Sequence, residues 1–384
     1  MSDPDALRLD VAFAPFDDAP TTAVQDSRAY AIRRRRNTFR QHPVPTGAMG
    51  KMPGMWTIPS GMDQQLPAEL APIVEWFDAE DDARERLRWA LRDSLDELLD
   101  GQRTGRWAYQ HLSKTEKTHL GTVVEVNLTK EFEFANGDHL DWQIAGRDID
   151  CKFSKDLGGW EIPMEMYLCA DHGERQGKAD YPALLTWFDD TTNRWAAGLI
   201  TISDERLRWK VGNPERAYNR DNKRSLANSS AEHVYWLWGG LQADLPRNLL
   251  LHLDPDVRRR ILSPELSGQK RVDELFRELQ GQIVGRQTVL TVAQQDDAPK
   301  RVRDSRIPLR EDGILVLGHQ DAHPKIAASL ELPVPVKGEW IAVRVIPVSE
   351  SDSRPFVTMH GDRWARAHND DPVIAVQMDY RYLT

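Results

Sequence analysis

Two hydrophobic periods alternate along the chain. From 82 to 99 and from 115 to 132, apolar residues recur every three or four positions, which predicts two amphipathic helices. After a turn signal the period falls to two, and apolar residues occupy every second position of 140–144 and 148–153. We therefore expect a β-hairpin, closed by a tight turn at Ala145-Gly146, directly after the second helix.

The next part of the chain continues the strand pattern. Strands are expected at 181–188 and 195–203, followed by an irregular, basic, asparagine-rich stretch at 213–228. Helices and strands interleaved in this way predict an α/β (α+β) module, in which a mixed sheet is flanked by helices.

A Ser-Pro-Gly boundary at 263–268 precedes a second pattern of short elements. Apolar residues at helical spacing in 272–292 are followed by a strand at 314–317, a short helix at 324–330 and a strand at 340–345. This order is typical of a winged helix-turn-helix module. The predicted division is a poorly ordered N-terminal extension at 1–62, an α/β module at 63–262 and a winged-helix module at 263–384.

Composition places the chain among ordinary globular proteins. Its 384 residues, 40% hydrophobic and 29% charged, are enough for two cores. No segment approaches the roughly 18 uninterrupted apolar residues of a membrane helix, and the first residues lack a secretion signal. The two cysteines, Cys151 and Cys169, exclude a disulfide framework and a four-cysteine zinc site. We therefore expect a cytoplasmic protein without membrane contact.

Net charge limits how the chain can meet nucleic acid. A formal net charge of -10 opposes unspecific coating of DNA, because an acidic field repels phosphates. Basic residues are nevertheless clustered at 216–224 and 300–310, and again at Arg33-Arg34-Arg35-Arg36 with Arg40. Each cluster is consistent with a local DNA contact and equally with a solvated face, and for the arginine run at 33–36 the solvated face is favoured.

Acidic residues and a lysine share one predicted face of the hairpin. Alternation directs Asp148, Asp150 and Lys152 outward, and Asp141 on the neighbouring strand reaches the same side. An Asp-x-Lys pattern alone is more often a solvated strand face than a site. When Asp141, nine positions before Asp150, is included, a functional site and a solvated strand face are equally favoured. The convergence of two carboxylates beside a lysine calls for a functional explanation.

This constellation suits metal-dependent hydrolysis of a phosphodiester. Two carboxylates so placed can hold Mg²⁺, which prefers oxygen ligands, polarises a phosphate and lowers the pKa of its bound water. Lys152 would orient that water and offset developing negative charge. Glu125, on the preceding helix, and the backbone carbonyl of Cys151 are further candidate ligands. No glycine-rich phosphate loop is found, so no nucleotide cofactor is expected.

Beyond this short pattern, a series of motifs in one order resembles a single family of nucleases. The motifs are Asp100-Gly-Gln-Arg-Thr-Gly-Arg-Trp107, Lys114-Thr-Glu-Lys-Thr-His119, Val124-Glu-Val-Asn-Leu128, Asp150-Cys-Lys-Phe-Ser154, Asn219-Arg-Asp-Asn-Lys-Arg224, Arg271-Val-Asp-Glu-Leu-Phe276, Val292-Ala-Gln-Gln-Asp-Asp297, Leu317-Gly-His-Gln-Asp321 and Leu332-Pro-Val-Pro335. From about residue 63 onward the chain resembles the NaeI family of type II (type IIE-like) restriction endonucleases, a branch of the PD-(D/E)xK nucleases. The first sixty or so residues and the stretch 160–166 depart from the family pattern.

The resemblance implies a catalytic quartet of Glu125, Asp141, Asp150 and Lys152, in agreement with the metal chemistry above. It implies a restriction-system enzyme that uses Mg²⁺ to cleave double-stranded DNA within a palindrome, GCCGGC, and leaves 5′-phosphate ends. It also implies a C-terminal domain similar to the DNA-binding domain of catabolite activator proteins, which binds a second DNA copy. A homodimer follows, because two-fold symmetry lets paired active sites attack both strands.

The basic residues that are candidates for DNA contact are Lys114, Lys117, Arg220, Lys223, Arg224, Lys300, Arg301 and Arg303. Two other functions remain open from the residues alone. A catalytically inactive DNA-binding regulator would need the helix-turn-helix but not the quartet, and a phosphoesterase of small molecules would need a compact pocket but no second basic module. The complete set of catalytic residue types disfavours the regulator, and the basic segment at 300–310 disfavours the phosphoesterase.

Overall fold

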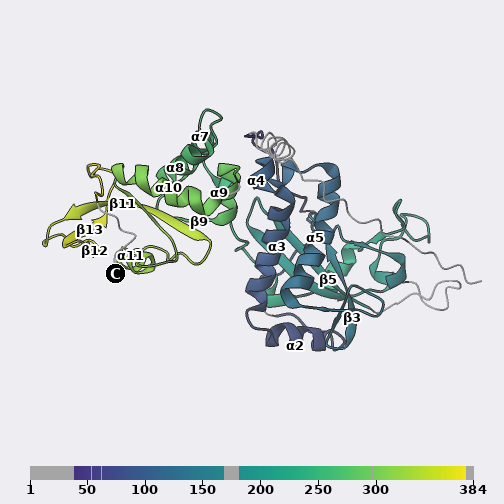
Figure 1. Cartoon of the computed structure of the whole chain (residues 1–384). Coiled ribbons are helices and arrows are strands. Elements are labelled where there is room, and N and C mark those ends of the chain that lie inside the picture. The colour runs from purple at the N-terminus through teal and green to yellow at the C-terminus, as the bar shows by residue number, and fades with distance from the viewer. Residues whose placement is uncertain (1–38, 53, 62, 168–180, 296, 378–384) are drawn as a thin grey trace, which may run out of the picture. The chain divides into compact units, whose positions relative to one another are not determined.

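The computed structural model describes residues 39–52, 54–61, 63–167, 181–295 and 297–377, and the part from residue 39 onward forms one compact unit (Figure 1). Cys169 and the arginine cluster at 33–36 lie outside the described residues. The helices of this part are α2 (Ala71–Ala79), α3 (Ala83–Leu99), α4 (Gly101–Thr104), α5 (Lys114–Phe132), α6 (Leu249–His252), α7 (Pro255–Ile261), α8 (Gly268–Glu278), α9 (Arg286–Ala293), α10 (Ala298–Glu311) and α11 (His323–Ser329). The strands are β1 (Ala135–Asn136), β2 (Trp142–Ile144), β3 (Arg147–Phe153), β4 (Glu161–Ile162), β5 (Pro182–Asp189), β6 (Arg194–Thr201), β7 (Arg224–Ser225), β8 (Tyr235–Trp236), β9 (Ile283–Gly285), β10 (Ile314–Leu317), β11 (Glu339–Val348), β12 (Phe356–Met359) and β13 (Asp362–Arg366).

A mixed sheet organises the first half of the described chain. It has six strands in the order β1-β2-β3-β5-β6-β8 among the described residues. The pairing of β3 with β5 is parallel, and the other neighbours are antiparallel. The predicted mixed sheet is therefore confirmed. Because β3 pairs on both sides, it lies inside the sheet and not at its edge.

Both faces of this sheet are covered. On one face, α3 and α5 pack against Ile149, Cys151 and Leu184, and Figure 1 shows these two helices lying along β3 and β5. On the other face, Trp160 and Leu185 belong to a separate, tryptophan-rich cluster. The amphipathic helices predicted at 82–99 and 115–132 are confirmed as α3 and α5, because their apolar stripes form one wall of this core.

The hairpin is also confirmed, but part of its polar face is buried. Ala145 and Gly146 adopt φ values of 50° and 73°, as a two-residue turn with both central residues left-handed requires. Asp148 and Asp150, expected to face outward into solvent, are 9% and 5% exposed. Alternation reveals one buried face but is silent about a second layer, and here that layer covers the polar side as well. Asp148 is satisfied there by the backbone N–H of Asp138 at 3.1 Å.

A second, antiparallel sheet organises the C-terminal part. Its described strands have the order β10-β11-β13-β12, and β9 also pairs with β11. The helices α8, α9 and α10 bury their apolar residues against it. The strands predicted at 314–317 and 340–345 and the helix predicted at 324–330 are confirmed, whereas α10, β12 and β13 were not predicted. Charged residues and Pro308 obscure the helical period of α10, whose buried residues, among those with described side chains, are Val302, Ser305 and Leu309.

The described part of the expected N-terminal extension is irregular but packed. Met49 and Trp56 are buried, and the backbone of Arg40 both donates to and accepts from the side-chain amide of Gln294, at 2.8 and 2.9 Å. Residues 39–61 therefore contribute to the core without forming a helix or a long strand. Every helix that the structure describes is too short or too polar to cross a bilayer.

A buried ion pair ties α3 to the rest of the molecule. The guanidinium of Arg92 donates to Asp190, in the turn after β5, and to Asp96, one helical turn further along α3. Asp190 is 1% exposed and also accepts from the side-chain amide of Asn248 at 3.0 Å. That amide donates in addition to the carbonyl of Trp107 at 2.8 Å. One carboxylate thus holds together α3, the sheet and the segment that leads to α6.

Replacing Arg92 with alanine should lower the free energy of unfolding by about 3–5 kcal/mol, because the buried Asp190 would lose its main partner. Urea denaturation followed by tryptophan fluorescence measures the change. The matched control is Arg103→Ala, since Arg103 pairs with Asp100 but has a side chain 76% exposed, and exposed pairs contribute about 0–1 kcal/mol. Equal losses in the two variants would contradict the role given to the buried pair.

Candidate active site

The polar residues of the hairpin meet where β2 begins. Trp142 pairs with Ile149, so Asp141, one residue before β2, lies opposite Asp150. The backbone N–H of Cys151 donates to Asp141 Oδ2 at 2.8 Å. This bond fixes the Asp141 carboxylate beside β3. The structure therefore brings Asp141 and Asp150 together, as alternation across a hairpin predicts.

Lys152 closes the cluster from the same strand. Its ammonium forms an ion pair with Asp150 Oδ2 and donates to the carbonyl of Cys151 at 3.1 Å. Lys152 has a side-chain exposure of 19%, against 7% for Asp150. A lysine held at the surface end of a buried carboxylate can leave that carboxylate and meet an incoming anion without first crossing the core.

Glu125 lies on α5, and two hydrogen bonds connect its backbone to β2, the strand that begins directly after Asp141. The indole N–H of Trp142 donates to Thr129 Oγ1 at 2.7 Å, and the Thr129 hydroxyl donates to the Glu125 carbonyl at 2.8 Å. The helix begins at Ser113, whose side chain forms a reciprocal capping box with Glu116. Capping at one end and the tryptophan contact near the other fix α5 along its length.

Electrostatics couples the members of this cluster. Burial raises the pKa of Asp150 to about 7, and the charge of Asp141 adds to the rise, while Lys152 opposes it. Burial, followed by the charge of Asp141, also raises the pKa of Glu125. Burial disfavours the ammonium of Lys152, but the charge and hydrogen bond of Asp150, together with the charge of Asp141, raise the lysine pKa overall. Lys152 is therefore cationic near neutral pH, and its single positive charge does not balance the carboxylates around it.

These residues fit a hard divalent cation by donor type. Asp150 Oδ2 is buried and has no hydrogen-bond donor near it apart from the Lys152 ammonium. Three carboxylates and the Cys151 carbonyl are oxygen donors of the kind that Mg²⁺ selects. Within the described ranges, no three His, Cys, Asp or Glu side chains form a preassembled metal cluster. The donor chemistry is present, and the side chains would have to rotate to converge on one ion.

The two candidate DNA-contacting residues on α5, Lys114 and Lys117, have different surroundings. Lys114 is exposed in the first turn of the helix. Lys117 is half-buried: its ammonium lies 5.2 Å from the Tyr109 ring centre and donates to the Gln110 carbonyl at 3.4 Å. Lys114 is accessible to a phosphate, whereas Lys117 already has partners within the protein.

Arg224 requires a correction, because it does not reach the surface. The side chain is completely buried, pairs with Asp204 and donates to the Arg208 carbonyl at 3.1 Å. Its guanidinium lies over the rings of Tyr167 and Trp209, 4.9 and 5.0 Å from their centres. In this position the side chain stabilises the fold and presents no surface to a DNA phosphate. A basic run in a sequence gives no sign of which side chain turns inward.

The basic segment at 300–310 lies on α10, where its residues have different surroundings. Lys300 and Arg303 are exposed. Arg301 is half-buried, donates to Gln269 Oε1 at 3.4 Å and lies 3.7 Å from Asp304. Lys300 and Arg303 are therefore accessible, and Arg301 is partly engaged with its own module.

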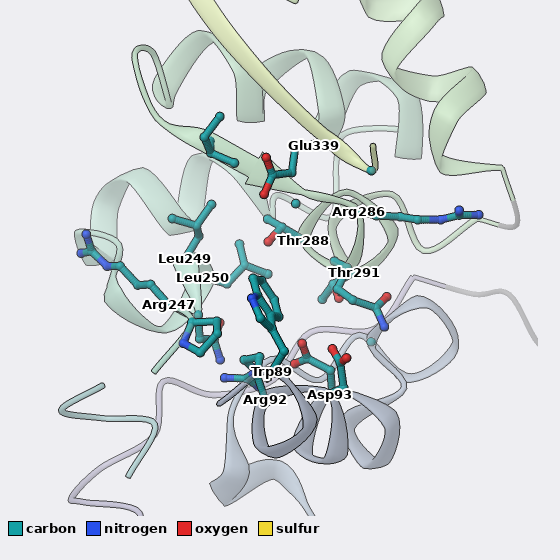
Figure 2. Close-up of a pocket in the computed structure, with 18 of the residues that line it drawn as sticks. Trp89, Arg92, Asp93, Arg247, Leu249, Leu250, Arg286, Thr288, Thr291 and Glu339 are labelled. Atoms are coloured by element: carbon teal, nitrogen blue, oxygen red, sulfur yellow. Dashed lines mark hydrogen bonds and ion pairs between the residues drawn. The ribbon is translucent and has the colours of Figure 1, made fainter. Parts of the chain in front are cut away.

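A cavity of about 850 Å³ lies elsewhere and was not found from the sequence. Figure 2 shows Trp89 and Asp93 of α3 pointing toward Leu250 and Thr291. Burial raises the pKa of Asp93 to about 6, with a further contribution from the charge of Asp96. The helical period of α3 marks its core side, but polar residues on the other side carry no signal that distinguishes a cavity wall from a solvated face. None of the quartet Glu125, Asp141, Asp150 and Lys152 lines this cavity.

Comparison with known proteins agrees with the motifs. Residues 71–375, most of the chain, match the sequence model of the family described as Restriction endonuclease NaeI. A relative named Type II restriction enzyme NaeI, from Lentzea aerocolonigenes, is 44% identical over 300 residues. That match covers 76% of this chain and 87% of the relative.

Arg224→Ala should destabilise the fold by about 3–5 kcal/mol, because it would leave Asp204 with one arginine fewer and open a space between two aromatic rings. Thermal unfolding monitored by near-UV circular dichroism reports both the midpoint and the packing of Trp209. Arg220→Ala is the control, since that side chain is 95% exposed and its loss should leave the midpoint unchanged. A wild-type midpoint for Arg224→Ala would show that the buried pair is dispensable.

Proposed function

The chain belongs to the NaeI family of restriction endonucleases and is a site-specific deoxyribonuclease, and we propose that Glu125, Asp141, Asp150 and Lys152 form its active site. The observation that supports this assignment most strongly is the contact of two carboxylates and a lysine on β2 and β3. The raised pKa values of Asp150 and Glu125 support it further, because crowded carboxylates that resist ionisation attract a cation.

We propose Mg²⁺ as the cofactor, held by Glu125, Asp141, Asp150 and the carbonyl of Cys151. A divalent cation in such a site acts as a Lewis acid on a phosphodiester and lowers the pKa of a bound water. Asp141 can serve as a ligand without reorientation of the backbone, because the Cys151 N–H already holds it in place. Glu125 completes the donor set by rotation of its side chain from α5.

Lys152 has two roles in this proposal. Without DNA it neutralises Asp150, which keeps a buried carboxylate cluster compatible with the fold. With DNA bound, its ammonium turns to the scissile phosphate, donates to a non-bridging oxygen and offsets the negative charge that develops there. The raised pKa of Lys152 keeps it protonated for this purpose and argues against a role as general base.

The two sheets support a two-module arrangement. We propose a PD-(D/E)xK catalytic module at 63–262 and a winged-helix module at 263–384, the latter because the helices α8, α9 and α10 precede the antiparallel strands β10, β11, β12 and β13. In this arrangement the C-terminal module binds a second DNA copy through exposed residues such as Lys300 and Arg303. Of the N-terminal extension at 1–62, Met49 and Trp56 add to the core of the catalytic module, whereas Arg40 contacts Gln294 of the C-terminal module.

The substrate follows from the family. We propose cleavage within the palindrome GCCGGC, by a homodimer that presents one active site to each strand and leaves 5′-phosphate ends. The compartment is the cytoplasm, where foreign DNA is met and where a chain with two cysteines stays reduced.

With plasmid DNA and Mg²⁺, the wild-type protein should give discrete fragments, and Asp150→Ala and Lys152→Ala should each slow cleavage at least about a hundredfold. The reason is that one variant loses a cation ligand and the other loses charge stabilisation. Gel analysis with mapping of the fragment ends measures both rate and site.

Asp138→Asn is the matched control for this experiment, because Asp138 is an exposed acidic residue in the loop before β2 and should leave cleavage unchanged. Retention of full activity in Asp150→Ala would place the active site elsewhere. Specific binding without cleavage by the wild type would assign the chain to DNA-binding regulators.

Addition of Mg²⁺ should raise the melting temperature of the wild type but not that of Asp150→Asn. A ligand that binds only the folded state stabilises it by about 2.7 kcal/mol at a hundredfold excess over its Kd. Scanning calorimetry in the absence of DNA isolates this effect from catalysis. If both proteins melted higher by the same amount, the ion would be binding outside the carboxylate cluster.

A further inference from the structure

We propose that the turn at 219–223 reads the DNA sequence, with Arg220 donating to the edge of a guanine in the major groove. This inference rests on the proposed endonuclease function and adds to it a residue that selects the substrate. The turn at 219–223, called here the tip, belongs to an irregular segment at 207–226, called here the finger. The inference rests on the exposed guanidinium of Arg220, which lies on a well-defined turn. The base of the finger that carries this turn is hydrogen-bonded through neighbouring residues to β3.

The base of the finger is a narrow antiparallel pair. Leu207 bridges Leu226, and Trp209 bridges Arg216. The backbone N–H of Arg208 donates to the Ser225 carbonyl at 2.9 Å. Two segments far apart in the finger are thus held side by side, and the loops between them project as defined turns.

Buried charge anchors this base. Asp204 forms ion pairs with Arg224 and with Arg216, and the Arg216 guanidinium lies 2.8 Å from the Asp204 carboxylate. Both guanidiniums lie near the Trp209 ring, that of Arg216 at 5.7 Å and that of Arg224 at 5.0 Å from its centre. These contacts bury Arg224 completely and leave Arg216 only 22% exposed. They leave Arg220 and Lys223 as the residues of the finger tip that carry accessible positive charge.

The tip itself is preorganised by one side chain. Asn219 Oδ1 accepts hydrogen bonds from the backbone N–H of Asp221 at 2.9 Å and of Lys223 at 2.8 Å. The Asn219 N–H donates to the Lys223 carbonyl at 2.8 Å, and Asn222 takes a left-handed conformation with φ of 56°. Asparagine tolerates that conformation better than other side chains do. The turn is therefore already folded before it meets DNA.

Arg220 is at the apex of this turn and points away from the protein. Its side chain is 95% exposed, and its one described contact is with the neighbouring Asp221, at 3.4 Å. Arg216 and Arg224, by contrast, are 22% and 0% exposed. Holding a guanidinium out on a rigid turn contributes nothing to folding, which is the arrangement expected of a residue that acts on a partner.

Hydrogen bonds connect the finger to the catalytic strand. The Thr186 hydroxyl donates to the Lys152 carbonyl at 3.2 Å, and the Trp160 indole donates to the Thr186 carbonyl at 2.9 Å. The Leu226 N–H then donates to the Trp160 carbonyl at 3.3 Å. Three bonds therefore join Lys152 to the base of the finger, so that the turn is held at a fixed position relative to the carboxylate cluster.

The chemistry of the apex suits guanine. A guanidinium that donates two bonds to O6 and N7 of guanine is the commonest base-specific contact in DNA complexes, and a lysine ammonium makes a weaker, less directional one. Half-buried Lys223, four residues after Asn219, is placed to meet the adjacent phosphate, which carries no sequence information. The two residues should therefore differ in what their removal changes.

The test compares binding of wild-type protein, Arg220→Ala and Lys223→Ala to duplexes in the presence of Ca²⁺ and in the absence of Mg²⁺. Each duplex carries either the mapped cleavage site or the same site with one guanine replaced. Arg220→Ala should weaken binding to the intact site about ten- to a hundredfold and bind the substituted site as the wild type does. Lys223→Ala should weaken both duplexes equally and reduce the salt slope by about one.

If Arg220→Ala lost the same affinity for both duplexes, Arg220 would be a phosphate contact and the inference would be overturned. The inference would also be overturned if Arg220→Ala discriminated between the two duplexes as well as the wild type does. Arg220→Lys adds a second measurement: it keeps the charge but loses the paired donors, so it should recover phosphate-type affinity without recovering discrimination. Failure of the proposed function is distinguishable, because the wild type would then cleave no plasmid at any site. An unchanged melting midpoint in Arg220→Ala verifies that the fold is intact.

Discussion

The burial of Asp150 on an interior strand is the constraint on which the rest of the catalytic module depends. A carboxylate inside a covered sheet is tolerated only with positive charge beside it, and Lys152 on the same strand supplies that charge. The second layer that buries Asp150 also raises its pKa to about 7. In the proposed site, the packing that makes an ionised Asp150 costly to bury would favour a bound cation. Folding stability and the proposed catalytic role therefore place opposite demands on this carboxylate.

Buried arginines provide the second organising principle. Arg92 joins α3 to the turn after β5, and Arg224 anchors the base of the finger. Arg271, 3% exposed, donates to the carbonyls of Val292 and Ala293 at the end of α9. In a chain with a net charge of -10, each arginine used in this way is lost to DNA attraction. The positive charge that remains for DNA is concentrated on a few exposed turns and helix faces.

The extent to which the fold followed from sequence differs between elements. α3 and α5 were predicted because each buries one apolar stripe, and the hairpin because its apolar residues alternate along both strands. β10 was predicted as a short continuous apolar run, and both of its faces are buried. α10 was missed because its inner face includes a serine among half-buried charged residues and Pro308 interrupts the pattern. The strands β12 and β13 were missed because they form a short pair whose burial comes from the sheet and not from their own alternation.

By itself the sequence determined the residue types and order of the candidate site, because hairpin alternation and the family motifs both converge on Asp141, Asp150 and Lys152. It also determined the family. Tertiary structure alone decided which charges are buried, since burial depends on layers contributed from distant segments: Asp150 under the tryptophan-rich cluster, and Arg224 inside the finger. The local hydrophobic pattern of the sequence indicates which side of an element packs against the core. It does not indicate whether a distant segment covers the opposite side.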